Sequence, residues 1–86
     1  MTWKLEFDPA AAKELSRLDK AQQRTVIKYL DECCSLEDPA DRGHALTGQW
    51  AGFHRYRIGQ LRIIVKIIRG QMVIMTLRIG RRDSIY

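Results

Sequence analysis

The spacing of apolar residues along the chain changes from a period of two to a helical period, and then back to two. At the N-terminus, Trp3, Leu5 and Phe7 alternate with charged residues, which predicts a short half-buried strand. Asp8 and Pro9 follow, and this pair indicates a helix start, because the carboxylate can cap the helix and proline fits its first position. We therefore expect the chain to pass directly from a strand into a helix.

Two apolar stripes with helical spacing come next. Their members, in chain order, are Ala11, Leu15 and Leu18, and then Val26, Ile27, Leu30, Cys33 and Cys34. Because very few residues separate the two stripes, the helices should form a hairpin with a short connection. Residues 35–51 contain proline, glycine and several acids, and this composition predicts a loop.

From Phe53 onward the period of two returns. The expected strands are 53–58, 61–68 and 72–79, with turns at Gly59-Gln60 and around Gly70. The predicted fold class is α+β, in the order β-α-α-β-β-β: an N-terminal strand and a helical hairpin packed on a mostly antiparallel four-stranded sheet. We expect residues 1–86 to form a single domain, because a chain of this length supports only one small core.

A two-residue turn at Gly59-Gln60 would fix the register of the central hairpin. Arg57 would then lie directly opposite Arg62, where two like charges repel and favour an anion between them. Pleat alternation assigns one face of this hairpin to Phe53, Arg55, Arg57, Arg62, Ile64 and Lys66, and the helix-covered face to Tyr56, Ile58, Leu61, Ile63, Val65 and Ile67. If 72–79 is one unbroken strand, either Val73, Met75 and Leu77 or Met72, Ile74 and Arg78 join Ile64 on its face.

The positive charge of the chain is concentrated in its C-terminal part. Residues 52–86 carry eight basic side chains, seven of them arginines, against one acid, so their net charge is +7, whereas the rest of the chain has −2. An arginine-rich surface suits an anionic partner, nucleic acid first, because guanidinium groups bind phosphate with two parallel hydrogen bonds. Composition predicts no membrane span, no disulfide framework and no metal or other cofactor, which fits a cytoplasmic protein.

The ordered motifs of the second half resemble a known family. They are Leu46-Thr47-Gly48, the segment 53–65 (FHRYRIGQLRIIV) and the segment 79–86 (IGRRDSIY). Together they closely resemble the RelE toxins of bacterial type II toxin–antitoxin systems. The resemblance implies a metal-independent endoribonuclease that cuts messenger RNA in the ribosomal decoding site and is silenced by a cognate antitoxin. It also implies that operator DNA is bound only through the toxin–antitoxin complex.

The same resemblance assigns roles to individual residues. In such toxins the 2′-hydroxyl attacks the adjacent phosphate and releases a free 5′-hydroxyl. Arg62 matches the arginine that contacts the scissile phosphate, Arg82 the one that supports the leaving group, and Tyr86 the tyrosine that orients the nucleophile. Arg55 and Arg57 stand where relatives carry lysines and are expected to stabilise charge in the transition state. The remaining basic residues expected to bind RNA are Arg81, Lys66 and Arg78.

Two questions stay open at this point. The superfamily also contains gyrase inhibitors of ParE type without nuclease chemistry, and a degenerate module that only binds antitoxin is a further alternative. The general base is also open, because arginine keeps its proton and Tyr86 is the last residue of the sequence. His54 has suitable chemistry, but pleat alternation points it away from the arginines.

Overall fold

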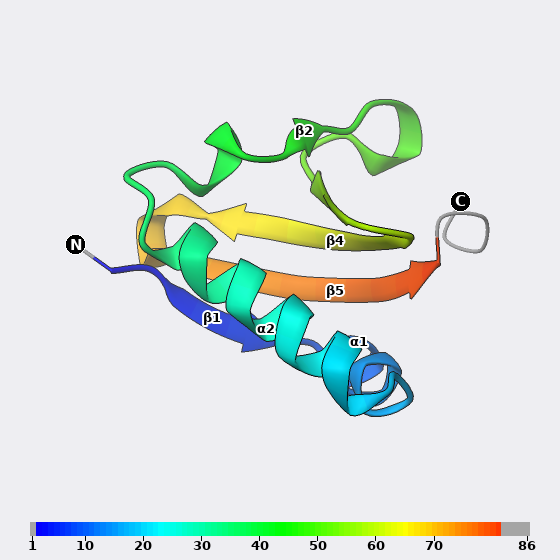
Figure 1. Ribbon diagram of the computed structural model, residues 1–86. Helices are drawn as coiled ribbons and strands as arrows, with labels where there is room; N and C mark the ends of the chain where they lie inside the picture. The colour runs from blue at the N-terminus through cyan, green and yellow to red at the C-terminus, as the bar shows by residue number, and fades with distance from the viewer. Residues whose placement is uncertain (1, 82–86) are drawn as a thin grey trace.

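The computed structural model describes residues 2–81, and Figure 1 shows their arrangement as two helices packed on a twisted sheet. The helices are α1 (Pro9–Ser16) and α2 (Lys20–Cys34), and the strands are β1 (Lys4–Phe7), β2 (His44–Ala45), β3 (His54–Ile58), β4 (Leu61–Ile68) and β5 (Val73–Arg81). Three single turns of 3-10 helix complete the list: η1 (Pro39–Asp41), η2 (Gly48–Trp50) and η3 (Arg69–Gln71).

The sheet has five strands in the order β1-β5-β4-β3-β2. Its only parallel pair among the described residues is β1 with β5, and the other neighbours are antiparallel. The predicted α+β class and element order are therefore confirmed. The predicted strand count is wrong by one, because β2 lies inside the stretch 35–51 that was expected to be a loop. Two residues are too few to show alternation, so only pairing with β3 defines this strand.

The first helix begins where the sequence predicts, and an aspartate side chain caps the start of each helix. The Asp8 carboxylate accepts a hydrogen bond from the amide of Ala10 at 3.1 Å, and the Asp19 carboxylate accepts one from the amide of Gln22 at 2.7 Å. These side chains satisfy amide groups that have no partner within the helix. The side-chain amide of Gln23 also donates to the Leu18 carbonyl oxygen at 3.0 Å, which fixes the short connection between α1 and α2.

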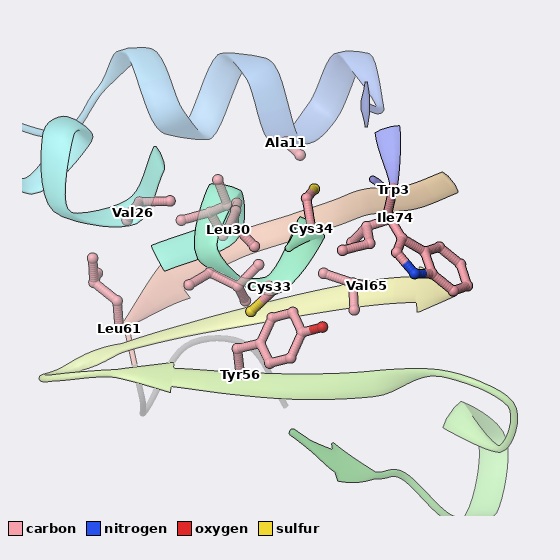
Figure 2. Close-up of a cluster of buried hydrophobic side chains, with 12 residues drawn as sticks. Trp3, Ala11, Val26, Leu30, Cys33, Cys34, Tyr56, Leu61, Val65 and Ile74 are labelled. Atoms are coloured by element: carbon pink, nitrogen blue, oxygen red, sulfur yellow. The ribbon is translucent and has the colours of Figure 1, made fainter. Parts of the chain in front are cut away.

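The helices cover one face of the sheet, and the hydrophobic core lies between the two layers. Figure 2 shows Tyr56 pointing from β3 toward Cys33 of α2, with Leu30 and Val65 nearby. The buried members of this core are Trp3, Ala11, Val26, Leu30, Cys33, Cys34, Tyr56, Leu61, Ile63, Val65, Ile74 and Ile79. The amide of Trp3 donates to the Cys34 carbonyl oxygen at 3.0 Å, so the start of β1 is tied to the end of α2.

The central hairpin has the predicted register. Ile58 pairs with Leu61 and Arg57 pairs with Arg62, around a tight turn in which Gly59 has a φ of 57°. This left-handed conformation favours glycine, which has no Cβ to clash with the backbone. We call the helix-free face of the sheet the arginine face; by register its residues on β3, β4 and β5 are Arg55, Arg57, Arg62, Ile64, Lys66, Ile68, Val73, Met75, Arg78 and Gly80.

The last strand, β5, is interrupted by a bulge, so it does not meet the condition of one unbroken strand over 72–79. Val65 pairs with Thr76 but Ile64 pairs with Arg78, so Leu77 is an extra residue that forms a bulge. In β5 the residues that point to the arginine face are therefore odd-numbered before the bulge and even-numbered after it. Neither predicted set is correct as a whole, because Val73 and Met75 come from one set and Arg78 from the other.

A candidate nucleic-acid interface on the arginine face

The strand register arranges the side chains of the arginine face in rows that cross the sheet. One row runs through His44, Arg55, Ile64 and Arg78, the next through Arg57, Arg62 and Gly80, and a third through Lys66, Met75 and Glu6. Side chains directly opposite each other on adjacent strands have Cβ atoms about 4.5–5.5 Å apart. The fold thus brings Arg55, Arg57, Arg62 and Lys66 together on one surface, as the sequence predicts.

Arg57 and Arg62 form the most concentrated positive charge of this surface. They lie directly opposite each other next to the Gly59 turn, where Arg57 is exposed and Arg62 is half-buried. A hollow of about 40 Å³ is lined by Arg57, Gly59, Leu61 and Arg62, which is room for a group of the size of a water molecule. Two guanidinium groups around such a hollow present a fork of donors that matches a phosphate.

Ile64 lies at the centre of the arginine face and is completely buried, although no helix covers this side of the sheet. Its neighbours by register are Arg55 and Arg78 on the adjacent strands, with Arg62 and Lys66 two residues away along β4. Basic side chains commonly cover apolar surface with their alkyl stems and hold the charged ends in water. A buried isoleucine surrounded in this way supports an ordered layer of positive charge.

The buried Nε of Arg55 has no hydrogen-bond partner within residues 2–81. Burial of a donor without an acceptor is costly, and native structures usually carry such groups only where a ligand, an ion or catalysis gives a reason. Arg55 is the cross-strand neighbour of Ile64 and lies two residues from Arg57, so it belongs to the same arginine face.

Arg78 has a different role in the structure. Its Nε and one terminal nitrogen donate to the Glu14 carboxylate at 3.2 and 3.1 Å, and the same carboxylate accepts the backbone amide of Ile79 at 2.9 Å. This ion pair raises the pKa of Arg78 and fastens α1 to the edge of β5. The expectation that Arg78 binds RNA remains a prediction, and binding would compete with this contact.

Of the remaining residues expected in the site, Lys66 and Arg81 lie within the described part of the chain. Lys66 is exposed and lies on the arginine face, four residues along β4 from Arg62. Arg81 pairs with Leu61, so the pleat directs it away from the side of Arg62 at the end of β5. Arg82 and Tyr86 lie outside the described residues, and their catalytic roles stay predictions.

The two histidines lie on opposite sides of the sheet. His54 pairs with Val65 on the helix-covered face, as alternation predicts, and burial together with the nearby Arg69 charge lowers its pKa below the usual 6.5. His44 pairs with Arg55 and is exposed on the arginine face. His44 was not among the site residues expected from the sequence, because residues 35–51 were expected to form a loop. The signal available in the sequence was the position of His44 two residues before the Leu46-Thr47-Gly48 motif.

Residues 2–81 contain neither a metal-binding cluster nor a membrane-spanning helix. No three histidine, cysteine, aspartate or glutamate side chains there are grouped so that they could hold a metal ion. Neither of the described helices has the length and apolar character needed to cross a membrane.

Comparison with known proteins identifies the family of this chain. The family model of the ParE toxin of type II toxin–antitoxin systems, parDE, matches residues 5–86. An Escherichia coli protein named as RelE-like toxin is 27% identical over 88 residues, a match that covers 96% of this chain and 86% of that protein.

Solved structures of toxin–antitoxin complexes share the fold. A chain of the RelBE2 complex from Mycobacterium tuberculosis has a TM-score of 0.86 at 20% identity, over 98% of this chain and 95% of that chain. A chain of the intact E. coli RelBE complex has a TM-score of 0.77 at 19% identity, over 95% of this chain and 99% of that one. The family match spans nearly the whole sequence and the fold agrees with it: the chain belongs to the ParE toxin family of type II toxin–antitoxin systems, within the RelE/ParE superfamily.

Proposed function

We propose that this toxin is a ribosome-dependent endoribonuclease that cleaves messenger RNA without a metal and so inhibits translation. The observation that carries the proposal is the cross-strand pair of Arg57 and Arg62 beside a hollow of about 40 Å³, with Arg55 in the adjacent row. Preformed positive charge of this kind stabilises the extra negative charge of a phosphorane, and one well-placed donor commonly contributes about 2.7–4 kcal/mol to the chemical step.

In the proposed reaction the scissile phosphate lies against Arg57 and Arg62. The 2′-hydroxyl of the preceding nucleotide loses its proton and attacks phosphorus, and the bond to the 5′-oxygen breaks to leave a 2′,3′-cyclic phosphate. Arg55 and Lys66 bind neighbouring phosphates and set the path of the strand across the sheet. Arg82 supports the departing oxygen and Tyr86 orients the nucleophile, as the resemblance to RelE toxins implies.

The proposed partners follow from the same family. The M. tuberculosis and E. coli structures contain complexes of a toxin with its antitoxin, and we propose that a cognate antitoxin silences this chain in the same way. We further propose that the ribosome presents the messenger RNA in its decoding site, that operator DNA is bound only through the toxin–antitoxin complex, and that the protein acts in the cytoplasm.

A second candidate function is inhibition of DNA gyrase without nuclease chemistry. The matching family model is that of ParE toxins, which favours this alternative, whereas the E. coli relative is RelE-like. In a gyrase inhibitor the arginine face would contact protein or DNA, and loss of Tyr86 would have no effect on toxicity.

Brief expression of the toxin alone in cells separates the two functions. Primer extension on translated messages and gyrase-linked DNA breaks are measured in parallel. New 5′ ends within translated codons, absent when translation is blocked, are expected for the nuclease. Intact messages with accumulating DNA breaks would contradict the nuclease and identify the gyrase inhibitor, and a harmless protein with neither effect would identify a binding module.

The variants Arg62→Ala and Arg82→Ala test the assigned arginines. Each is expected to abolish messenger RNA cleavage and toxicity, because each removes charge stabilisation from the reacting phosphate. Arg24→Ala is the matched control, since Arg24 is exposed on α2 and belongs to the helix layer rather than to the arginine face. Full toxicity of Arg62→Ala would contradict the assignment of the site.

A further inference from the structure

The proposed cleavage needs a group that accepts the proton of the 2′-hydroxyl, and the arginines cannot supply it. A guanidinium group keeps its proton throughout the pH range in which proteins are folded. Histidine is the side chain that most often acts as a general base, because it exchanges a proton near neutral pH. The candidates for the base are therefore the histidines and carboxylates that the fold places on the arginine face.

The strand register places one histidine next to the arginines. His44 of β2 pairs directly with Arg55 of β3, and β3 in turn places Arg57 two residues further along the same face. By sheet geometry, the Cβ atoms of His44 and Arg55 are about 4.5–5.5 Å apart, and those of His44 and Arg57 about 7–8 Å. The His44 side chain is exposed, so RNA lying on the arginine face could contact it.

Two hydrogen bonds, one on either side of this short strand, hold it in place. The Tyr56 hydroxyl donates to the Pro39 carbonyl oxygen at 2.8 Å in a buried position, so η1 is tied to β3 just before β2 begins. Burial raises the pKa of Tyr56 well above its usual value of 10, which keeps this donor protonated. On the other side of β2, the amide of Leu46 donates to the Phe53 carbonyl oxygen at 2.9 Å.

Gly43 contributes to the same placement by having no side chain. A Cβ on this residue would come within 2.9 Å of the Arg55 carbonyl oxygen and of two ring carbons of Tyr56. Only glycine therefore lets the backbone approach β3 so closely immediately before His44. The position of the imidazole relative to Arg55 is thus set by the packed hairpin rather than by a free loop.

Two other side chains, His54 and Glu6, fit the role of general base less well. His54 faces the helix layer and lies beside the ion pair of Asp38 with Arg69. Glu6 belongs by register to the row of Lys66 and Met75, two strands away from β4 and on the opposite edge of the sheet from His44. By register, neither is a direct or diagonal neighbour of Arg55 or Arg57 on the arginine face.

We propose that His44 is the general base of the cleavage reaction, an inference that rests on the proposed nuclease function. The imidazole takes the proton from the 2′-hydroxyl while the 2′-oxygen forms its bond to phosphorus. The bond from phosphorus to the 5′-oxygen breaks, this oxygen takes a proton from solvent, and the imidazolium returns its proton to solvent after product release. Electrons and protons balance without a metal or a further co-reactant.

The test is single-turnover cleavage of messenger RNA on programmed ribosomes by the full-length toxin, measured against pH. His44→Gln is expected to lower the rate by about 100-fold or more, in line with general-base contributions of about 10²–10⁴. It should also remove the rise of the rate with pH and leave ribosome binding unchanged. The charged groups near His44 are Arg55 and Arg57 on β3 and Asp41 and Arg42 in the preceding segment.

Two further variants separate catalysis from structure. His44→Ala should recover activity when imidazole is added to the reaction, because the small base can occupy the vacated space. His54→Gln is the control and should retain the pH dependence of the wild-type toxin. Wild-type activity of His44→Gln, or a reduced rate with unchanged pH dependence, would overturn this inference alone. Absence of cleavage by the wild-type toxin would overturn the nuclease proposal and this inference with it.

Discussion

Thr76 combines a polar side chain with complete burial. It is completely buried in β5 opposite Val65, and its hydroxyl oxygen has no hydrogen-bond partner within residues 2–81. A buried hydroxyl without a partner costs about 1–3 kcal/mol relative to water. Threonine nevertheless fits the strand because it is β-branched and close to valine in shape.

Thr76→Val is therefore expected to stabilise the protein by about 1 kcal/mol, because it removes the unsatisfied hydroxyl and keeps the volume of the side chain. For a domain of this size that corresponds to a rise in Tm of about 4–8 °C in thermal unfolding. Thr25→Val is the matched control, since the Thr25 hydroxyl is exposed on α2 and already donates to the Ala21 carbonyl oxygen at 3.0 Å. A lower Tm for Thr76→Val would show that the hydroxyl has a partner in solution.

At the scale of elements, β1 and α1 share the task of covering one edge of β5. The strand pairing ends where Phe7 meets Thr76, and the amide of Asp8 still donates to the Thr76 carbonyl oxygen at 2.8 Å. Beyond that point Glu14 of α1 takes over and accepts both the Ile79 amide and the Arg78 side chain. The part of the β5 edge that β1 is too short to cover is thus closed by the Glu14 carboxylate. This limits the pairing of that edge with other chains.

The Glu14 carboxylate should make stability depend on pH. Burial by itself would raise its pKa, but hydrogen bonds from Arg78 and from the Ile79 amide outweigh this effect and lower the pKa below the usual 4.5. A lowered pKa in the folded state means that the contribution is fully present above pH 4.5 and is lost as the pH falls through the lowered value.

Glu14→Gln should accordingly lower the free energy of unfolding by about 1–2 kcal/mol at neutral pH, because a charged acceptor of three hydrogen bonds becomes neutral. The difference from wild type should shrink below pH 4.5 in denaturant titrations. Glu32→Gln serves as control: its ion pair with Arg42 at 3.2 Å is solvent-exposed, and such pairs contribute little. A constant difference across this pH range would show that the Glu14 charge is not the stabilising feature.

On the scale of the whole molecule, the sheet separates two functions by its two faces. The helix-covered face carries the core, and the opposite face carries a cluster of cations around the buried Ile64. Like charges held close together destabilise the empty protein, and an anion bound among them offsets this repulsion. This concentration of positive charge on one face predicts that RNA binding is governed mainly by phosphate contacts.

The salt dependence of RNA binding should report these contacts. The logarithm of the affinity for a single-stranded RNA should fall linearly with the logarithm of salt concentration, at about 0.7 per phosphate contact. Arg57→Ala should reduce this slope by about one contact, because it removes one guanidinium group from the hairpin. Arg24→Ala, on the helix layer, should leave the slope unchanged, and an unchanged slope for Arg57→Ala would exclude this residue from the RNA interface.

Much of this molecule follows from local patterns that can be read along the chain. The cap at Asp8, the tight turn at Gly59 and the pairing of Arg57 with Arg62 depend on residues close in sequence, so periodicity and turn chemistry predict them. The resemblance to RelE toxins likewise rests on ordered segments of sequence, and the family match confirms the superfamily.

Other features depend on contacts between residues far apart in sequence, and only the tertiary structure decides them. The bulge at Leu77 lies where the pairing of β5 with β1 ends at Thr76 and the contacts of Glu14 with Arg78 and Ile79 begin, and no local pattern marks it. The pairing of β2 with β3 accompanies the hydrogen bond from Tyr56 to Pro39, 17 residues away, and this pairing places His44 beside Arg55. Apolar periodicity determined which face of each element is buried; the register between distant strands determined which polar side chains meet.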